Sequence, residues 1–211
     1  MKVMVTGATG YVGGRLALQL ASDGHEVNTV IRSKNKAGIL THPLIRLFEG
    51  DILNKESLAS AAKGCEAIYH LAAYAQVWSK DPDTYRKINV GGCENVLEAA
   101  RAAGVKRVIF TSTAGVFGPS DGQDVIEDSI RSIPFLTDYE STKAEAENKC
   151  REYALRDLEV VIVNPTRVYG PGQLSDSNAV TKLIKLYKAG KWRFMPGDGS
   201  SIDNYVFIDD V

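Results

Sequence analysis

The sequence TGATGYVG, residues 6–13, joins an apolar run at residues 3–5 to an amphipathic segment at Arg15–Leu20. A strand, a glycine-rich turn and a helix in this order bring the N–H groups of a helix N-terminus to the end of a sheet strand. These N–H groups have no partners inside the helix, so they form a site for a phosphate. The stretch therefore predicts a strand–turn–helix unit that binds an anion at its turn.

Each glycine of this turn has a distinct physical role. Gly7 allows the tight turn, Gly10 lets the backbone come close to a pyrophosphate, and Gly13 brings the helix against the strand. In a chain with 19 glycines, the string could also be a simple glycine-rich loop. The flanking segments decide between these two interpretations.

The segment after the turn favours a helix, because Val12, Leu16 and Leu20 form an apolar stripe at i, i+4 and i+8. With a strand before it and a helix after it, the turn is typical of a dinucleotide site. The expected contacts are Gly7, Thr9, Gly10, Tyr11, Val12 and Gly13.

Composition excludes several classes of protein. The 211 residues are 44% hydrophobic, enough for one good core, and the net charge of −1 without a Lys/Arg-dense stripe argues against a nucleic-acid surface. The three cysteines are widely spaced and suggest neither a disulfide framework nor a metal site. We interpret the early first strand as leaving no room for a signal peptide, and no apolar run is long enough to span a membrane. A reducing, cytoplasmic location is expected.

The rest of the chain alternates strand-like and helical segments. Strands are expected at Val27–Ile31, Leu44–Phe48, Ala67–Leu71, Lys106–Phe110, Val160–Val163 and Tyr205–Ile208, and helices at Lys55–Lys63, Tyr85–Ala103, Tyr139–Leu155 and Ala179–Lys188. Alternation of this kind predicts an α/β fold, namely a Rossmann-type doubly wound parallel sheet with helices on both faces. Residues 1–170 are the expected NAD(P)-binding domain, and residues 171–211 part of a small C-terminal substrate lobe. The long loop Ala114–Asp138 is expected to act as a lid.

The end of the second strand bears on the choice of cofactor. NAD-binding domains usually carry Asp or Glu there to hold the ribose 2′-hydroxyl. This chain has Ile31 and then Arg32, followed by Ser33 and Lys34, which suit a 2′-phosphate. NADP is therefore expected over NAD, although these residues could instead be solvated loop charges.

Two later strand ends should also contact the dinucleotide. Asp51 and Ile52 follow the third strand where the adenine would lie, although Asp51 could instead cap the next helix. The fourth strand runs into Leu71, Ala72 and Ala73, whose small side chains at 72 and 73 would let the backbone approach a ribose or pyrophosphate. His70 is expected to be a core histidine, because no second metal-ligating residue stands near it at a suitable spacing.

A pair of residues on one helix suggests the chemistry. Tyr139 and Lys143 are i, i+4 neighbours and follow the fifth strand by one loop. An ammonium near a phenol favours the phenolate, so Tyr139 can exchange a proton with a carbonyl oxygen that Thr113 binds. Lys143 would also hold the nicotinamide ribose. A second Tyr-x-x-x-Lys pair, Tyr187 and Lys191, has no strand end beside it, and we interpret it as coincidence.

Several strings occur in the order typical of one family: TGATGYVG (6–13), GDI (50–52), HLAA (70–73), NVGG (89–92), TST (111–113), YESTK (139–143) and PTRVYGPG (165–172). The chain resembles the extended short-chain dehydrogenase/reductase family, also called the NAD-dependent epimerase/dehydratase family. The resemblance implies a Ser/Thr–Tyr–Lys catalytic set with Ser112 and Asn89 as further members. It also implies nicotinamide contacts from the loop between Pro165 and Val168, and a homodimer.

Departures from the family pattern narrow the reaction. Dehydratases carry Thr-Asp-Glu where this chain has Thr113-Ala114-Gly115, so the acid and base for water elimination are missing. The glycine string and Arg32 are more similar to dihydroflavonol-reductase-like members, whereas residues 197–211 also resemble sugar-nucleotide enzymes. Family members are generally longer than this chain, so we expect either a fragment or a reduced substrate lobe.

The sequence therefore predicts an NADPH-linked oxidoreductase that reduces a small-molecule carbonyl to an alcohol. A nucleotide-sugar epimerase with tightly bound NAD is the first alternative. A catalytically silent NADP-binding regulator is the second. No metal, nucleic acid or membrane is expected to take part.

Overall fold

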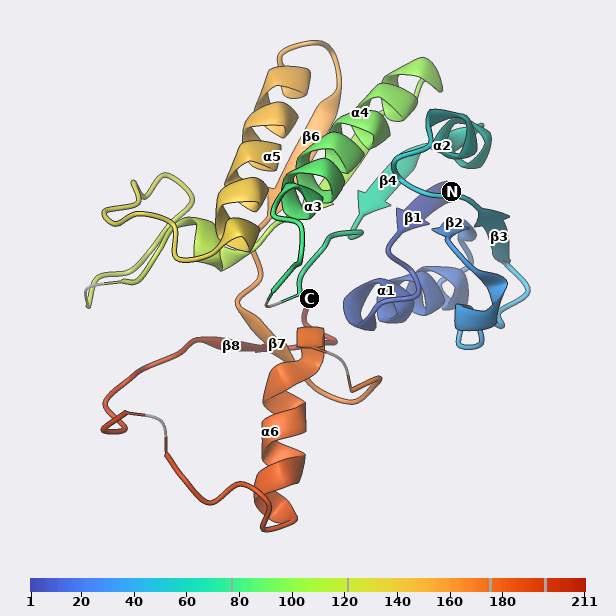
Figure 1. The fold of residues 1–211 in the computed structure, drawn as a ribbon. Coiled ribbons are helices and arrows are strands. Elements are labelled where there is room, and N and C mark those ends of the chain that lie inside the picture. Colours follow the sequence, from blue (N-terminus) through green and yellow to red (C-terminus); the bar gives the residue numbers. More distant parts are fainter. Residues whose placement is uncertain (77, 121, 175, 196) are drawn as a thin grey trace.

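The computed structural model describes residues 1–76, 78–120, 122–174, 176–195 and 197–211. Its centre is a six-stranded parallel sheet in the order β3-β2-β1-β4-β5-β6 (Figure 1). The strands are β1 (Lys2–Thr6), β2 (Glu26–Ile31), β3 (Ile45–Glu49), β4 (Ala67–His70), β5 (Arg107–Thr111) and β6 (Glu159–Val163). This is the strand order of the Rossmann fold, so the predicted fold class is confirmed.

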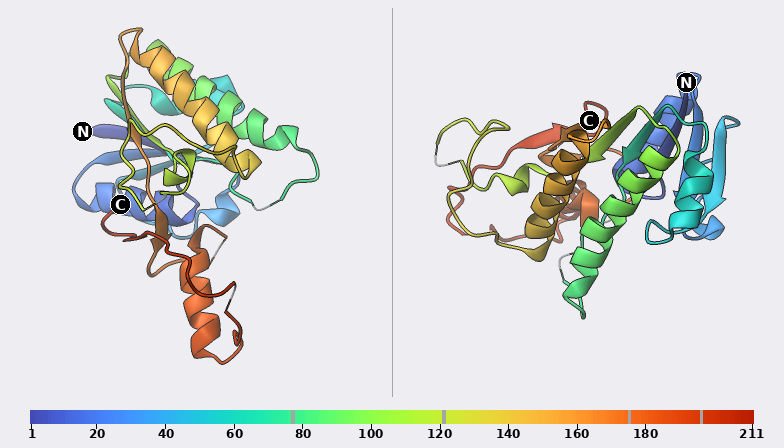
Figure 2. Two further views of the ribbon diagram at one scale, coloured as in Figure 1. Left: turned by 90° about the vertical axis from the view of Figure 1, so that its left-hand side faces the viewer. Right: turned by 90° about the horizontal axis from the view of Figure 1, so that it is seen from above.

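Helices cover both faces of this sheet (Figures 1 and 2). Helix α1 (Tyr11–Ser22) packs on one face; α2 (Lys55–Ala62), α4 (Gly92–Ala102) and α5 (Asp138–Ala154) pack on the other. Within β1, Val3 and Val5 face the α1 side while Met4 faces the opposite core. A strand buried on both faces in this way is typical of a parallel sheet.

The buried face of α1 differs slightly from the predicted stripe. It consists of Tyr11, Gly13, Gly14, Ala17, Leu20 and Ala21, whereas Val12 and Leu16 are only partly buried. The reason is the close approach at Gly13, where a Cβ atom would clash with the carbonyl of Gly7. Gly7 itself has φ +75°, and an added Cβ would lie 2.7 Å from the Ala72 nitrogen. The predicted steric roles of these two glycines are confirmed.

The segment expected as one regular helix at Tyr85–Ala103 is built differently. It begins with α3 (Asp83–Arg86), continues as a π-helical turn, η2 (Lys87–Gly91), and only then becomes α4. The wide turn contains the buried Asn89, which accepts a hydrogen bond from the Tyr74 backbone nitrogen at 2.7 Å. The uniform helix was therefore wrong, because a tertiary contact sets the local winding.

The boundaries of the other expected strands and of α2, α5 and the helix at Ala179–Lys188 agree with the sequence to within one or two residues. Helix α1 begins at Tyr11, four residues before the expected Arg15, and the strand at Arg167–Tyr169 was not expected.

The region expected as a continuous loop at 114–138 contains a short 3₁₀ turn, η3 (Ala114–Val116), and Asp121 of that loop lies outside the described residues. A second 3₁₀ turn, η1, spans Lys34–Lys36. The described chain has no helix with the length and apolar character needed to cross a membrane.

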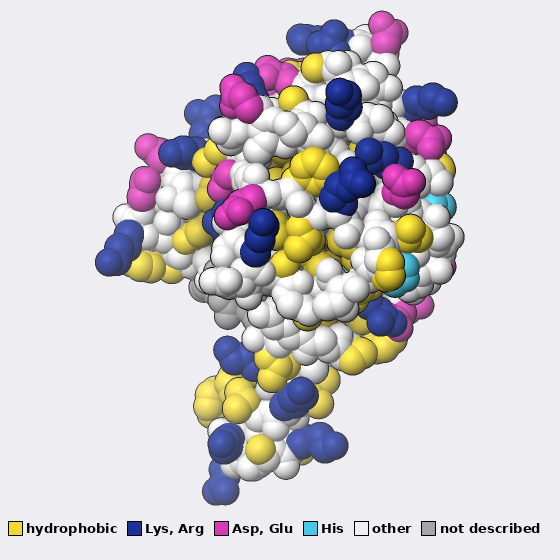
Figure 3. Space-filling model, turned by 90° about the vertical axis from the view of Figure 1, so that its right-hand side faces the viewer, with side chains coloured by type: hydrophobic (Ala, Val, Ile, Leu, Met, Phe, Trp, Pro, Cys, Tyr) yellow, Lys and Arg dark blue, Asp and Glu magenta, His cyan; other side chains and the backbone are white. Residues whose placement is uncertain are grey.

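The C-terminal part projects from the carboxyl side of the sheet (Figures 1 and 2). It contains β7 (Arg167–Tyr169) paired in parallel with β8 (Tyr205–Phe207), η4 (Asp176–Asn178) and α6 (Ala179–Lys188). Figure 3 shows hydrophobic side chains between the cations on this projection. Because β7 precedes residue 170 and pairs with β8, the predicted boundary between residues 170 and 171 cuts across a paired unit; the division into two domains stays a prediction.

We predict that Gly13→Ala lowers the free energy of unfolding by about 1–3 kcal/mol, because the new methyl group overpacks the contact between α1 and the Gly7 carbonyl. Urea denaturation measures this change. Gly91→Ala is the control: its φ is −63° and no atom would lie within 4 Å of the new Cβ. It should shift stability by no more than about 1 kcal/mol. Equal effects of the two changes would contradict the steric explanation.

Candidate active site

A large cavity opens where the carboxyl ends of β1, β4, β5 and β6 meet. Its volume is about 2490 Å³, and its walls include the glycine turn, the segments after β4 and β5, and the loop before α5. Ligand pockets for drug-sized molecules are typically about 300–1,000 Å³. The cavity is therefore large enough for a dinucleotide together with a second molecule.

One end of the cavity is formed by the N-terminus of α1. Gly10 is the N-cap residue, no side chain caps the helix there, and its first turn carries no acidic residue. All the residues predicted for this turn line the cavity: Gly7, Thr9, Gly10, Tyr11, Val12 and Gly13. The free N–H groups and the positive end of the helix dipole thus face a space that an anion can enter.

The remaining predicted cofactor contacts, with one exception, also line the cavity. These residues are Arg32, Asp51, Ile52, Leu71, Ala72, Ala73, Pro165 and Val168, and the exception is Lys143. Asp51 does not cap α2; it accepts a hydrogen bond from the Leu53 nitrogen at 2.9 Å, and Asn54 is the N-cap. The capping alternative for Asp51 was therefore wrong.

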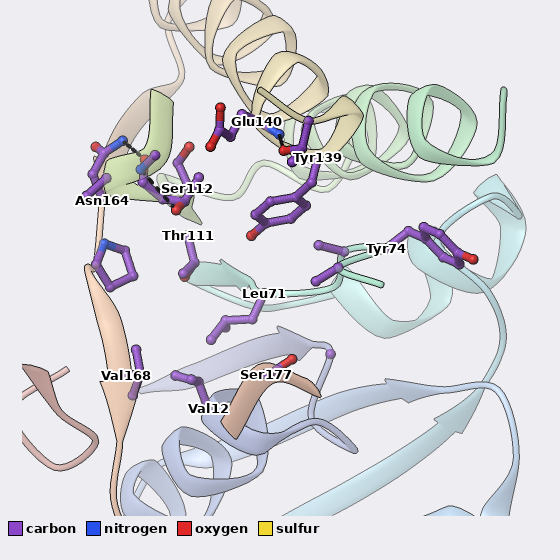
Figure 4. Close-up of a pocket in the computed structure, with 18 of the residues that line it drawn as sticks. Val12, Leu71, Tyr74, Thr111, Ser112, Tyr139, Glu140, Asn164, Val168 and Ser177 are labelled. Atoms are coloured by element: carbon purple, nitrogen blue, oxygen red, sulfur yellow. Dashed lines mark hydrogen bonds between the residues drawn. The ribbon is translucent and has the colours of Figure 1, made fainter. Parts of the chain in front are cut away.

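Tyr139 occupies the middle of the cavity. Figure 4 shows its ring projecting from α5, with the hydroxyl directed toward the side where Thr111 and Leu71 lie. Burial raises the pKa of Tyr139 above its usual value, which is opposite to the expected stabilisation of the phenolate. In this state the hydroxyl is a proton donor at neutral pH.

The polar residues after β5 lie beside this tyrosine. Ser112 and Thr113 both line the cavity, as predicted. The Ser112 hydroxyl is buried and has no hydrogen-bond partner among the described residues. The Thr113 hydroxyl accepts a hydrogen bond from the Gly115 nitrogen at 3.2 Å and caps η3.

Lys143 lies beneath the cavity floor and does not line it. Its ammonium donates to the Thr111 carbonyl at 2.8 Å and lies 3.9 Å from the centre of the Phe110 ring. Burial lowers the pKa of Lys143 to about 8, although nearby Cys93 and Cys150 oppose this shift. The expected contact with a ribose is therefore not met in this conformation, because the side chain supports the end of β5 from below.

Asn89 and two cysteines share this deeper layer. The Asn89 amide donates to the Thr142 hydroxyl at 3.0 Å and fixes the Tyr74 backbone, so it acts on the cavity wall from behind. Cys93 and Cys150 are buried free thiols whose sulfur atoms lie 3.8 Å apart. His70 is buried and its Nδ1 lies 2.7 Å from the Thr6 hydroxyl, which confirms it as a core histidine.

The alternative Tyr-x-x-x-Lys pair is elsewhere. Tyr187 is 71% exposed on α6 and is not among the described residues of the cavity wall. Among all the residues that the structure describes, no three His, Cys, Asp or Glu side chains come together as a metal site would require.

Comparison with known proteins agrees with this geometry. Residues 3–211 match the model of the NAD dependent epimerase/dehydratase family. The chain belongs to this family. The similar proteins named below are a protein of sterol demethylation, a putative reductase and a sugar-nucleotide epimerase.

Two relatives and one solved structure illustrate this range. The chain is 34% identical to sterol demethylase protein B of Methylococcus capsulatus over 93% of its own length, and 30% identical to a putative dihydroflavonol 4-reductase of Synechocystis over 98%. It spans 60% of the length of each relative. The UDP-glucuronic acid 4-epimerase of Bacillus cereus, solved with UDP-glucuronic acid and NAD, is 31% identical with a TM-score of 0.87; the match covers 100% of this chain and 70% of that one.

The ion pair between Arg131 and Glu140, which was not predicted from the sequence, joins three parts of the cavity wall. Arg131 donates to the Glu140 carboxylate at 2.9 Å and to the Gly115 carbonyl at 2.5 Å, and its guanidinium lies over the Phe135 ring. Glu140 directly follows Tyr139 and also accepts from the Leu136 nitrogen. The pair therefore fixes the loop before α5 to η3 and to the turn of α5 that carries Tyr139.

A second missed network lies about two turns further along α5. Glu147 is 3% exposed and accepts hydrogen bonds from Asn164 at 2.7 Å and from Arg151 at 3.0 Å. Asn164 also donates to the Thr113 carbonyl at 3.2 Å. The i+4 spacing of Tyr139, Lys143 and Glu147 is a signal that could have found this residue.

We predict that Glu140→Gln lowers the free energy of unfolding by about 1–3 kcal/mol, because it leaves the Arg131 charge, only 10% exposed, without its carboxylate. Limited proteolysis should then cleave the loop at residues 122–136 faster. Glu145→Gln on the same helix is the control, since its partner Arg86 is 70% exposed; its effect should stay below about 1 kcal/mol. Unchanged protection of the loop in Glu140→Gln would show that the pair does not hold it.

Proposed function

We propose that this chain is part of an oxidoreductase that uses NADPH to reduce a ketone or aldehyde to an alcohol. The observation that carries the proposal is the hydroxyl of Tyr139, which projects into a cavity whose far end is an uncapped helix N-terminus. Reduction of a carbonyl needs a proton donor, and a phenol, which carries its proton at neutral pH, is one. Ala114 and Gly115 stand where dehydratases carry Asp and Glu, which argues against dehydration.

The residues present suit a dinucleotide. Gly7 and Gly10 leave the backbone free of Cβ atoms, and the first N–H groups of α1 face the cavity, so they would hold the pyrophosphate. Asp51 and Ile52 would contact the adenine, and Leu71, Ala72, Ala73, Pro165 and Val168 would line the path to the nicotinamide. When bound, NADPH would supply the hydride that reduces the carbonyl carbon.

The chain's own residues would bind and protonate the substrate. Ser112, whose hydroxyl has no partner among the described residues, and Thr113 would hold the carbonyl oxygen near Tyr139. Tyr139 would then donate its hydroxyl proton to that oxygen as the carbon is reduced. Lys143 would hold the end of β5 in place through its hydrogen bond to the Thr111 carbonyl. Asn89 would hold the cavity wall in place through the backbone of Tyr74. We further propose that the protein acts in the cytoplasm as a homodimer.

We predict that Tyr139→Phe lowers kcat for carbonyl reduction at least about 100-fold, because it removes the proton donor and little else. The dissociation constant of NADPH, measured by fluorescence, should stay within about twofold of the wild-type value, because the cofactor end is unchanged. Tyr187→Phe, in the second Tyr-x-x-x-Lys pair, is the matched control and should leave both quantities unchanged. An active Tyr139→Phe variant would exclude the assignment.

The preference for NADPH rests on Arg32. This exposed side chain lines the cavity directly after β2, and it forms no ion pair with the described part of the chain. Arg32→Ala should weaken NADPH binding about 10- to 100-fold, as expected for loss of a charge-assisted hydrogen bond, and should hardly change NADH binding. Titration of both cofactors measures this. Lys63→Ala is the control because Lys63 is exposed and is not among the described lining residues.

A sugar-nucleotide epimerase with bound NAD is the second candidate. It is supported by the likeness to the Bacillus cereus epimerase, which was solved with NAD and a UDP-sugar. NAD that remains bound through purification, together with interconversion of UDP-sugars, would favour this candidate over the reductase.

A further inference from the structure

Glu147 is a buried carboxylate on α5, the helix that also carries Tyr139 and Lys143. It is 3% exposed, and its two oxygens accept hydrogen bonds from different partners: Oε1 from the Asn164 amide at 2.7 Å and Oε2 from Arg151 at 3.0 Å. The Arg151 side chain is 56% exposed, so water can take its place, whereas Asn164 is half-buried. Loss of the bond to Asn164 should therefore cost more than loss of the bond to Arg151.

The Asn164 side chain joins this carboxylate to the segment that follows β5 (Figure 4). Its Nδ2 also donates to the Thr113 carbonyl at 3.2 Å. An amide nitrogen has two N–H bonds, and both of these acceptors lack a hydrogen, so the nitrogen and not the oxygen of the amide must face them. The side chain of Asn164 is thus a bridge from Glu147 to the backbone of Thr113.

Backbone hydrogen bonds hold the same segment on either side of this bridge. The Ser112 nitrogen donates to the Val163 carbonyl at 2.8 Å. The Ala114 nitrogen donates to the Pro165 carbonyl at 3.0 Å. The segment after β5, which carries Thr113, is therefore joined to the segment after β6 as one unit.

Helix α5 is tied to this unit at two points. The first is the Lys143 ammonium, which donates to the Thr111 carbonyl at 2.8 Å. The second is the Asn164 bridge from Glu147. Because Tyr139, Lys143 and Glu147 follow one another at i+4 spacing on a single helix, these two ties set where the Tyr139 hydroxyl stands relative to the segment after β5.

We propose that Glu147 is a positioning residue for carbonyl reduction: through Asn164 it fixes Thr113, which would bind the carbonyl oxygen, relative to Tyr139, which would protonate it. This inference rests on the proposed function and adds a residue that is not among the described residues lining the cavity. A displacement of about 1 Å between reacting groups can lower a rate about 100-fold, so a tie behind the site can control turnover.

The test measures kcat for the reduction of acetophenone by NADPH. Glu147→Ala and Asn164→Ala should each lower kcat about 10- to 100-fold, while KM and the dissociation constant of NADPH stay within about threefold of the wild-type values. The double variant should lower kcat no further than the more severe single variant, because both changes break one bridge. Independent, multiplying effects would overturn the inference, and so would a wild-type kcat in either single variant.

Glu147→Gln separates the hydrogen bond from the charge and guards against a variant that fails to fold. Its amide oxygen can still accept from Asn164, so kcat should stay within about threefold of the wild-type value. Rates are measured at about pH 6.5, because burial lowers the pKa of Lys143 to about 8 and its ammonium must stay charged. A Glu147→Gln variant as impaired as Glu147→Ala would overturn the inference.

Arg151→Ala is the matched control, because it removes the exposed partner of the same carboxylate and leaves the bond to Asn164 in place. It should leave kcat unchanged. Urea denaturation of every variant confirms that the rates come from folded protein. A loss of kcat in Arg151→Ala equal to that in Asn164→Ala would assign the effect to the helix as a whole and would contradict the bridge.

Hydrogen exchange separates this inference from the proposed function, because it needs no turnover. In Glu147→Ala, the amide protons of Ser112 and Ala114 should exchange at least about tenfold faster, while those of β1 stay unchanged. Faster exchange, with no reduction of any ketone or aldehyde tried by the wild-type protein, would contradict the proposed reaction and support the bridge. Reduction by the wild-type protein, with unchanged exchange and unchanged kcat in Glu147→Ala, would do the reverse.

Discussion

The close approach of α1 to β1 is the constraint on which the rest of the structure depends. Gly13 packs against the carbonyl of Gly7, and Gly7, at φ +75°, packs against the backbone of Ala72 after β4. One turn thereby fixes the helix to its strand and the first strand to the fourth. Because the strand order reverses between β1 and β4, the free N–H groups of α1 face the crevice where ligands of such sheets bind.

Helix α5 organises the second half of the site at three depths. Tyr139 projects into the cavity, Lys143 lies beneath its floor, and Glu147 holds the segment after β6 through Asn164. A charged ammonium on a residue that is only 2% exposed is tolerated because it has the Thr111 carbonyl and the face of Phe110 as neighbours. The same contacts explain why the end of β5, which carries Ser112 and Thr113, is held in place from below.

Local chemistry in the sequence was enough to predict the sheet, the glycine turn and the position of Tyr139, because each depends on short-range periodicity and turn geometry. The depth of Lys143 and the π-helical turn around Asn89 were not predicted, since both depend on contacts between segments far apart in the chain. The start of α5 was expected one residue late, although Thr137 and Glu140 have capping-box spacing. The capping-box spacing also identifies Glu140 from the sequence, whereas its ion-pair partner Arg131 is identified only by the structure.

The distribution of charge shows how this fold divides recognition between its parts. Anion binding at the cofactor end depends on backbone N–H groups and the α1 dipole, which any sequence with the right glycines retains. The loops after β4 and before α5 form other walls of the cavity, and their side chains can change without cost to the sheet. Arg131 contributes structure to this wall, because its charge is paired with Glu140 and its guanidinium also donates to the Gly115 carbonyl. The position of the loop before α5 is therefore coupled to the turn that carries Tyr139 through one ion pair, because Glu140 directly follows Tyr139 and accepts hydrogen bonds from Arg131 and from the Leu136 nitrogen.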